Sequence, residues 1–338
     1  MAEMTRLIAT FGRVVMGVVL MTAASAAQAV PLDPAALGTA PFTDPAVVTP
    51  MPPEWLARPL RRENPDADLA IILDQQIYGA LVPFIEEFAR KEKLKVAVQS
   101  GTCGIAATEL ARKAIDIGGY CCAPEAADRL PGIRFHTIGI TAITLIVHPD
   151  NPVENVSLDE ARRLFGGRIT KWSDVAGTPA ATRSGESVRV ITRLHCKARP
   201  GHWRLLLNDE ESFSHDANDV GAIPDMIRAV SLHRNAIGYE TNWHVAVHAP
   251  KAPVRQIRID GVDARDAEAL ARHRYPIYEV MTLTTWEGAA ANPKADRLVA
   301  YLLERARDIG GEYGLVPVQD LVRAGWIFKG DELVGEPR

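Results

Sequence analysis

Four cysteines carry the most distinctive chemistry of this chain: Cys103, Cys121, Cys122 and Cys196. Cysteine thiolates bind soft and borderline metal centres, and cysteine thiols also pair as disulfides in oxidising compartments or serve as small apolar fillers. The spacing contains no Cys-x-x-Cys pair, so it matches no zinc-finger, redox or haem-attachment motif. The role of the cysteines therefore depends on where the fold places them.

The first 29 residues have the pattern of an export signal. Arg6 and Arg13 precede an apolar stretch, and Ala27-Gln28-Ala29 has small residues at the two positions that a signal peptidase reads. The apolar stretch is shorter than the roughly 20 residues needed to span a bilayer. We therefore expect cleavage after Ala29 and a mature protein in a periplasm, where thiols meet an oxidising environment.

Composition and charge narrow the class of protein. The chain has 338 residues, enough for two domains. Its 38 Lys and Arg residues against 42 Asp and Glu residues give a formal net charge of -4, which argues against a nucleic-acid partner. No Gly-x-Ser-x-Gly, Walker or HExxH motif is present, so we expect a binding protein and not an enzyme. Residues 30–65 hold nine prolines, which indicates an extended arm or tether.

Short apolar strands alternate with helical patterns in the body of the chain. Leu69–Leu73, Lys95–Gln99 and Ile115–Ile117 are expected to be strands, and each is followed by a helical pattern or turn. This alternation predicts an α/β fold with a mostly parallel sheet, whose ligand site lies at the carboxyl ends of the strands. Three of the cysteines lie at such ends, in Ser100–Gly104 and Gly118–Cys122.

The middle of the chain has features of a different kind. Ile138–Val147 is too long for one ordinary buried strand, so we expect it to cross from one domain to the next, with a second crossing near Trp243–His248. Ser157 and Glu160 form a capping-box pattern at the start of a helix. Asn292–Arg307 has the apolar periodicity of a helix.

Several stretches together resemble the phosphate-type periplasmic solute-binding proteins of ABC transporters. An Asn-Pro turn in His148–Val153 is followed by a helix and by Leu164-Phe-Gly-Gly-Arg-Ile-Thr-Lys-Trp-Ser-Asp-Val175. The latter is similar to the family's Ile-Phe-x-Gly-x-x-x-x-Trp-x-Asp stretch. Arg193, Ala236–Tyr239 and Arg274–Ile277 follow in the family's order.

The resemblance implies a hinged two-lobe α/β fold of the periplasmic-binding-protein, or Venus-flytrap, type. One lobe would comprise residues 66–145 plus 247–338, and the other residues 146–246. A small ligand would bind between the lobes and be delivered to an ABC transporter permease or presented to a membrane sensor. The ligand-binding side chains that the resemblance implies are Gln75, Gln76, Thr102, Tyr120 and Arg193.

The cysteines mark departures from the family's pattern. Cys121-Cys122 stands where the family has a small polar residue and an Asp, and Arg193 lacks the Ser-Gly-Thr that should follow it. We therefore expect phosphate not to be the main ligand. Arg193 is either an anion clamp or a salt-bridge partner within the protein.

Three interpretations of the cysteines stay open. In the first, Cys103, Cys121, Cys122 and Cys196, with His195, bind a thiophilic metal, a metalloid or an iron–sulfur cluster in the cleft. In the second, they form disulfides that staple the cleft of an oxyanion-binding protein. In the third, they are apolar fillers. A redox or cofactor-carrying protein on the same fold is the alternative to solute capture.

Overall fold

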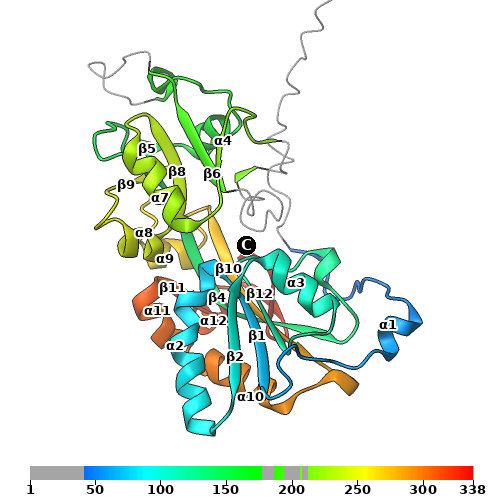
Figure 1. The fold of residues 1–338 in the computed structure, drawn as a ribbon. Coiled ribbons are helices and arrows are strands. Elements are labelled where there is room, and N and C mark those ends of the chain that lie inside the picture. Colours follow the sequence, from blue (N-terminus) through cyan, green and yellow to red (C-terminus); the bar gives the residue numbers. More distant parts are fainter. Residues whose placement is uncertain (1–41, 177–185, 194–205, 208–211, 338) are drawn as a thin grey trace, which may run out of the picture. The chain divides into compact units, whose positions relative to one another are not determined.

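The part of the chain that the computed structural model describes comprises residues 42–176, 186–193, 206–207 and 212–337 (Figure 1). Its first elements alternate between parallel strands and helices, as predicted. Apolar side chains at three- and four-residue steps, Leu81, Ile85 and Phe88, bury one face of the first long helix. These elements are β1 (Leu69–Asp74), α2 (Gln75–Glu92), β2 (Val96–Gly101), α3 (Cys103–Ala111) and β3 (Ile117–Tyr120).

Two long antiparallel strands, β4 (Ile133–Val147) and β10 (Tyr278–Trp286), run through the middle of the sheet. The first part of β4 pairs with β10, and its last residues pair with β8 (Ala236–Thr241). Since β4 takes part in both sets of pairs, one strand joins the two halves of the sheet. The run Ile138–Val147, expected to cross between domains, lies within it.

The second crossing expected near Trp243–His248 is wrong. These residues form helix α8 (Asn242–His248). The helix is favoured because the side chain of Thr241 accepts a hydrogen bond from the backbone N–H of His244 and so caps the first turn. The long strand that pairs with β4 is instead β10.

The remaining described elements, apart from a short helix in the N-terminal arm, are shorter strands, helices and 3-10 helices. They are η2 (Ala126–Asp128), β5 (Asn155–Val156), α4 (Leu158–Phe165), η3 (Trp172–Asp174), β6 (Arg189–Arg193), β7 (Asn218–Val220), α7 (Ile223–Leu232), β9 (Arg255–Ile259), α9 (Ala267–Ala271), η6 (Gly288–Ala290), α10 (Pro293–Glu304), α11 (Ala306–Tyr313), β11 (Leu315–Pro317), α12 (Val318–Arg323), β12 (Ile327–Lys329) and β13 (Glu332–Gly335). β6 runs parallel to both β7 and β8. The helix predicted over Asn292–Arg307 is observed as α10 and the start of α11.

The sheet is mixed and not mostly parallel. Within the described residues its strands follow the order β2-β1-β3-β10-β4-β8-β6-β7, with β9 and β11 also paired to β4. β10 is antiparallel to β3 and β4, and β4 is antiparallel to β8. The prediction of a mostly parallel sheet is therefore wrong in the middle, because the chain does not enter β4 and β10 through the βαβ crossovers that impose a parallel direction.

Buried apolar side chains gather in two clusters on this sheet. One cluster includes Leu73, Leu81 and Leu298, and the other includes Phe165 and Tyr239. Two cores fit the two-lobe α/β fold that was expected. The lobe boundaries, residues 66–145 plus 247–338 and residues 146–246, stay a prediction. No helix in the described part of the chain is both long and apolar enough to cross a membrane.

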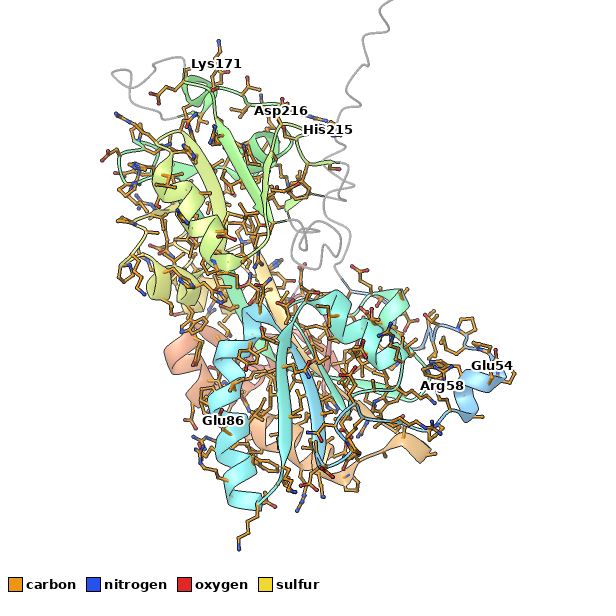
Figure 2. The ribbon with its side chains drawn as sticks, viewed as in Figure 1. Glu54, Arg58, Glu86, Lys171, His215 and Asp216 are labelled. Carbon is orange, nitrogen blue, oxygen red and sulfur yellow. The ribbon has the colours of Figure 1, made fainter. Side chains whose placement is uncertain are left out.

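The described part of the proline-rich arm, residues 42–65, packs against the fold. Its short helix α1 (Pro53–Ala57) buries Trp55, whose Nε1 donates a hydrogen bond to the carbonyl of Ala111 at 2.6 Å. Glu54 and Arg58, on either side of Trp55, are exposed (Figure 2). Proline is compatible with this helix because it occupies the first turn, where its missing N–H is not needed.

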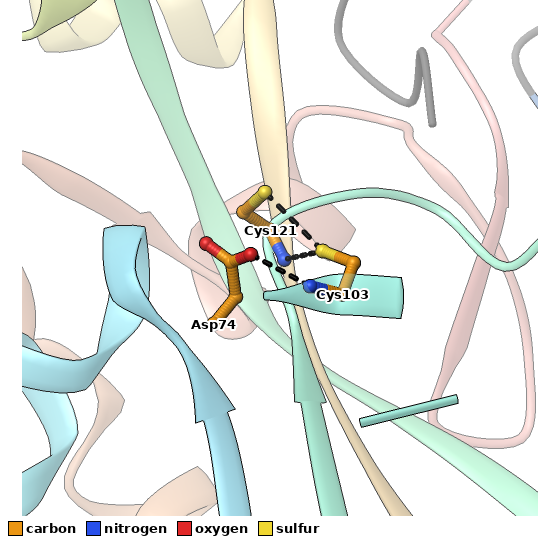
Figure 3. Close-up of side chains that lie close together, drawn as sticks. All are labelled: Asp74, Cys103 and Cys121. Carbon is orange, nitrogen blue, oxygen red and sulfur yellow. Dashed lines mark hydrogen bonds between the residues drawn. The ribbon is translucent and has the colours of Figure 1, made fainter. Parts of the chain in front are cut away.

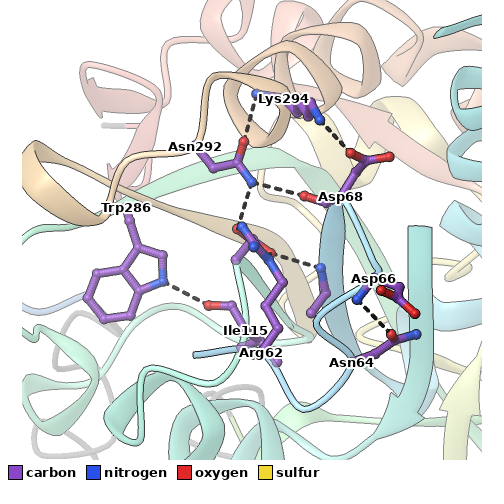
Figure 4. A network of polar contacts seen from close by, with 10 residues as sticks. Arg62, Asn64, Asp66, Asp68, Ile115, Trp286, Asn292 and Lys294 are labelled. Atoms are coloured by element: carbon purple, nitrogen blue, oxygen red, sulfur yellow. Dashed lines mark hydrogen bonds and ion pairs between the residues drawn. The ribbon is translucent and has the colours of Figure 1, made fainter. Parts of the chain in front are cut away.

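A polar network also holds the arm in place (Figure 4). Arg62 donates two hydrogen bonds of 2.6 Å to the buried carboxylate of Asp116. Asn292 donates to the same carboxylate at 2.8 Å. Two parallel hydrogen bonds from one arginine to a buried carboxylate are strong and fix the geometry of the pair. This part of the arm therefore belongs to the folded body.

Ser157→Ala is expected to destabilise the protein by about 1 kcal/mol. The predicted capping box is present, since Ser157 Oγ accepts from the Glu160 N–H at 3.1 Å and the Glu160 carboxylate accepts from the Ser157 N–H at 2.8 Å. Alanine leaves the first donor without its partner. Urea unfolding measures the loss, with Ser157→Thr as the control that keeps the hydroxyl. An equal loss in both variants would contradict the capping role.

Candidate functional site

The carboxyl ends of β1, β2 and β3 meet at one edge of the sheet. The strand register places Asp74, the last residue of β1, beside Gly101, the last residue of β2. Cys103 begins α3 two residues later, and Cys121 and Cys122 directly follow β3. Because adjacent parallel strands end side by side, the fold brings these three cysteines together.

The three sulfur atoms lie close together in the protein interior (Figure 3 shows Cys103 and Cys121). Sγ of Cys103 lies 3.5 Å from Sγ of Cys121 and 3.8 Å from Sγ of Cys122. A disulfide needs about 2.05 Å, so these sulfurs are not bridged to one another. The exposed fractions of the three residues are 5%, 5% and 1%. The contacts with Cys103 and Cys122, and then burial, raise the pKa of the Cys121 thiol well above its ordinary value.

Asp74 adds an oxygen donor to the sulfurs. Its Oδ1 accepts a hydrogen bond from the Gln76 N–H at 2.8 Å, and its Oδ2 accepts one from the Cys103 N–H at 2.8 Å. A carboxylate oxygen of Asp74 and the Sγ atoms of Cys103 and Cys121 all lie within 4.8 Å of one another. Burial, and then the nearby Cys103, raise the pKa of Asp74 to about 8. A metal bound here could therefore have only cysteine sulfurs as ligands, or cysteine sulfurs together with a carboxylate oxygen of Asp74.

Two more buried carboxyl groups lie near this group. Glu240 Oε1 is 3.6 Å from Arg193 Nε, and Glu240 Oε2 accepts a hydrogen bond from Gln76 Nε2 at 3.2 Å. Glu279 is 1% exposed, and neither of its carboxylate oxygens has a hydrogen-bond partner among the described residues. Burial, and then the charges of Asp74 and Glu240, raise the pKa of Glu279 well above its ordinary value. We call Asp74, Glu240 and Glu279 the acidic enclosure, with Arg193 as its counter-charge.

The other predicted ligand-binding side chains have varied surroundings. Thr102 caps α3, since its hydroxyl accepts from the Ile105 N–H at 3.2 Å. Tyr120 is buried, with its ring centre 6.4 Å from that of Phe135. The rest are Gln75, half-buried at the start of α2, and Gln76 and Arg193, both beside Glu240. His195 and Cys196 lie outside the described residues, so their ligand role stays a prediction.

The residue pattern of the sequence did not indicate the acidic enclosure. Asp74 had a usable signal, because it is an acidic residue at the carboxyl end of an apolar strand, where ligand sites form. Glu240 and Glu279 lie in the strands β8 and β10, and no local pattern indicates that they approach Asp74. For Arg193, the structure shows the ion pair within the protein that was one of its two expected roles.

Comparisons with known proteins place this geometry in a wider context. A family model described as the PBP superfamily domain matches residues 63–302. The phosphate-binding protein PstS of Bacillus subtilis (strain 168) is 24% identical over 250 residues, which cover 72% of this chain and 77% of that protein. An ABC-type phosphate transport receptor from Vibrio cholerae aligns with a TM-score of 0.61 at 18% identity, over 73% of this chain and 99% of the receptor. A phosphate ABC transporter substrate-binding protein from Clostridium perfringens, with bound phosphate, aligns with a TM-score of 0.64 at 18% identity, over 74% of this chain and 99% of that protein.

Proposed function

The chain belongs to the PBP superfamily, and we propose that it is an exported, non-catalytic solute-binding protein for a thiophilic ligand. The resemblance to phosphate-type periplasmic solute-binding proteins is confirmed by the comparisons. The proposed ligand is a metal, a metalloid or a metal cluster. It would bind through the thiolates of Cys103, Cys121 and Cys122.

The observation that carries this proposal is the convergence of three thiols at the ends of neighbouring strands. Two thiolates at about 2.3 Å from one tetrahedral metal lie about 3.8 Å from each other. The Sγ separations from Cys103 are 3.5 and 3.8 Å. The sulfur of Cys103 therefore lies at the spacing of two ligands of one centre from the sulfurs of both Cys121 and Cys122.

A phosphate-like oxyanion is the second candidate, and the likeness to phosphate-binding relatives supports it. The described contacts oppose it. The Cys103 N–H at the start of α3 is the kind of donor that binds oxyanions, but it donates to Asp74. Arg193, which could bind an anion, is already paired with Glu240. We therefore place oxyanion binding second.

We propose that the protein works in a periplasm and passes its ligand to an ABC transporter permease or presents it to a membrane sensor. The export pattern of residues 1–29 and the ABC-type relatives support this location and these partners. A permanently held iron–sulfur cluster or metal cofactor would indicate the redox alternative instead. Visible absorption or stoichiometric metal in the protein as purified would distinguish that alternative from reversible capture.

Reduced, metal-free protein is expected to take up one Cd²⁺ or one arsenite per chain, because soft centres select thiolates over water. Native mass spectrometry gives the stoichiometry, and calorimetry gives the affinity for each probe and for phosphate. Protein whose thiols are blocked with N-ethylmaleimide under mild denaturation and then refolded is the control, and should take up neither probe. Micromolar or tighter phosphate binding without uptake of either thiophile would overturn the proposal.

A further inference from the structure

The acidic enclosure limits the charge that the thiol site can hold. Asp74 lies within 4.8 Å of the sulfurs of Cys103 and Cys121. Glu279 is buried without a hydrogen-bond partner among the described residues, and it interacts electrostatically with Asp74, Glu240 and Cys103. These carboxyl groups supply no positive charge, so negative charge left on the sulfurs in this buried site would have neither water nor a cation from them to compensate it. A ligand that leaves the sulfurs without net charge is therefore favoured.

Thiophilic centres differ in the net charge that they leave on three thiolates. A monovalent ion such as Cu(I) leaves two negative charges, and a divalent ion such as Zn²⁺ leaves one. A trivalent centre leaves none. If the carboxylate of Asp74 also became a ligand, each complex would gain one more negative charge. Burying charge without a partner is unfavourable, so the neutral complex of three thiolates fits this interior best.

We propose that the ligand class of this site is a trivalent metalloid hydroxide, namely arsenous acid or its antimony counterpart, held by Cys103, Cys121 and Cys122. This inference rests on the proposed function and narrows it. In the binding step three metalloid–oxygen bonds break and three metalloid–sulfur bonds form. Each thiol proton leaves with one hydroxyl group as water. The metalloid stays trivalent, so no oxidant or reductant is required.

The geometry suits such a centre. A trivalent metalloid keeps a lone pair and binds three sulfurs on one side as a shallow pyramid, so it needs no fourth ligand. Cys103 lies 3.5 and 3.8 Å from the other two sulfurs, and its backbone is held by the hydrogen bond from its N–H to Asp74. Asp74 thereby acts as a positioning residue, and the centre would sit on the sulfurs alone.

Competition between arsenite and Zn²⁺ on the reduced, full-length exported protein tests this inference. Arsenite is expected to bind one per chain and at least about 100-fold more tightly than Zn²⁺. It should release almost no protons, whereas Zn²⁺ bound by thiolates must release them. Calorimetry in two buffers of different ionisation enthalpy counts the protons. Native mass spectrometry should show the gain of one arsenic atom and the loss of three hydrogen atoms.

The outcomes separate this inference from the proposed function. Tighter binding of Zn²⁺ than of arsenite, with proton release, would overturn the metalloid assignment and leave thiophile capture standing. Binding of phosphate with uptake of neither probe would remove both. An arsenic adduct that has lost fewer than three hydrogen atoms would also overturn the assignment. Because all these measurements use the wild-type chain, they do not depend on the folding of a variant.

Discussion

Cys103→Ser is expected to weaken the binding of arsenite and of Cd²⁺ by at least about 100-fold. Cys103 is central because its sulfur contacts those of both Cys121 and Cys122, at 3.5 and 3.8 Å. Serine keeps the size of the side chain and the backbone hydrogen bond to Asp74, but its hydroxyl is a hard donor that a soft centre binds poorly. Calorimetry and native mass spectrometry on reduced protein measure the loss.

Thr108→Ser is the matched control for this variant. It changes an exposed residue of α3 but keeps the hydroxyl that donates a hydrogen bond to the Gly104 carbonyl. Its affinity for arsenite should stay within about twofold of the wild type, since an exposed exchange that keeps the hydroxyl changes little. A folded Cys103→Ser protein that retains wild-type affinity would show that the three thiols do not form the site.

Glu279→Gln is expected to become increasingly more stable than the wild type as the pH rises. Burial, and then the charges of Asp74 and Glu240, raise the pKa of Glu279 well above its ordinary value of 4.5. The folded protein therefore holds a proton that the unfolded chain releases. The stability linked to this proton is fully present below the unfolded pKa and is lost as the pH rises through the folded pKa. Glutamine does not titrate, so it avoids this loss.

The advantage of Glu279→Gln in free energy of unfolding should grow by up to about 1.4 kcal/mol per pH unit above about pH 5. Urea unfolding of the two proteins at about pH 5.5 and about pH 8 measures it. Glu86→Gln is the control, because the Glu86 side chain is 63% exposed on α2 (Figure 2) and its replacement should change stability little at either pH. A stability difference for Glu279→Gln that does not change with pH would mean that Glu279 is ionised in the folded protein.

Local sequence patterns predicted the elements that depend on neighbouring residues. The alternation of β1, α2, β2 and α3 follows from apolar periodicity, and the capping box of α4 follows from Ser157 and Glu160. The crossing between domains predicted near Trp243–His248 is wrong, because the Thr241 cap favours a helix there. Short apolar runs fit both strands and helices, so such errors are expected there.

The sequence by itself determined which cysteines the protein has. The order of its family-like motifs also predicted that these cysteines share one site. Only the tertiary structure decided which groups surround them. Asp74 ends β1, Glu240 lies in β8 and Glu279 lies in β10, and the chain segments that separate these residues are long. Whether such residues meet depends on strand order and register, which are determined by backbone hydrogen bonds and by the packing of whole elements. Local patterns carry no information about these contacts, so the charge of the site could be read only from the folded chain.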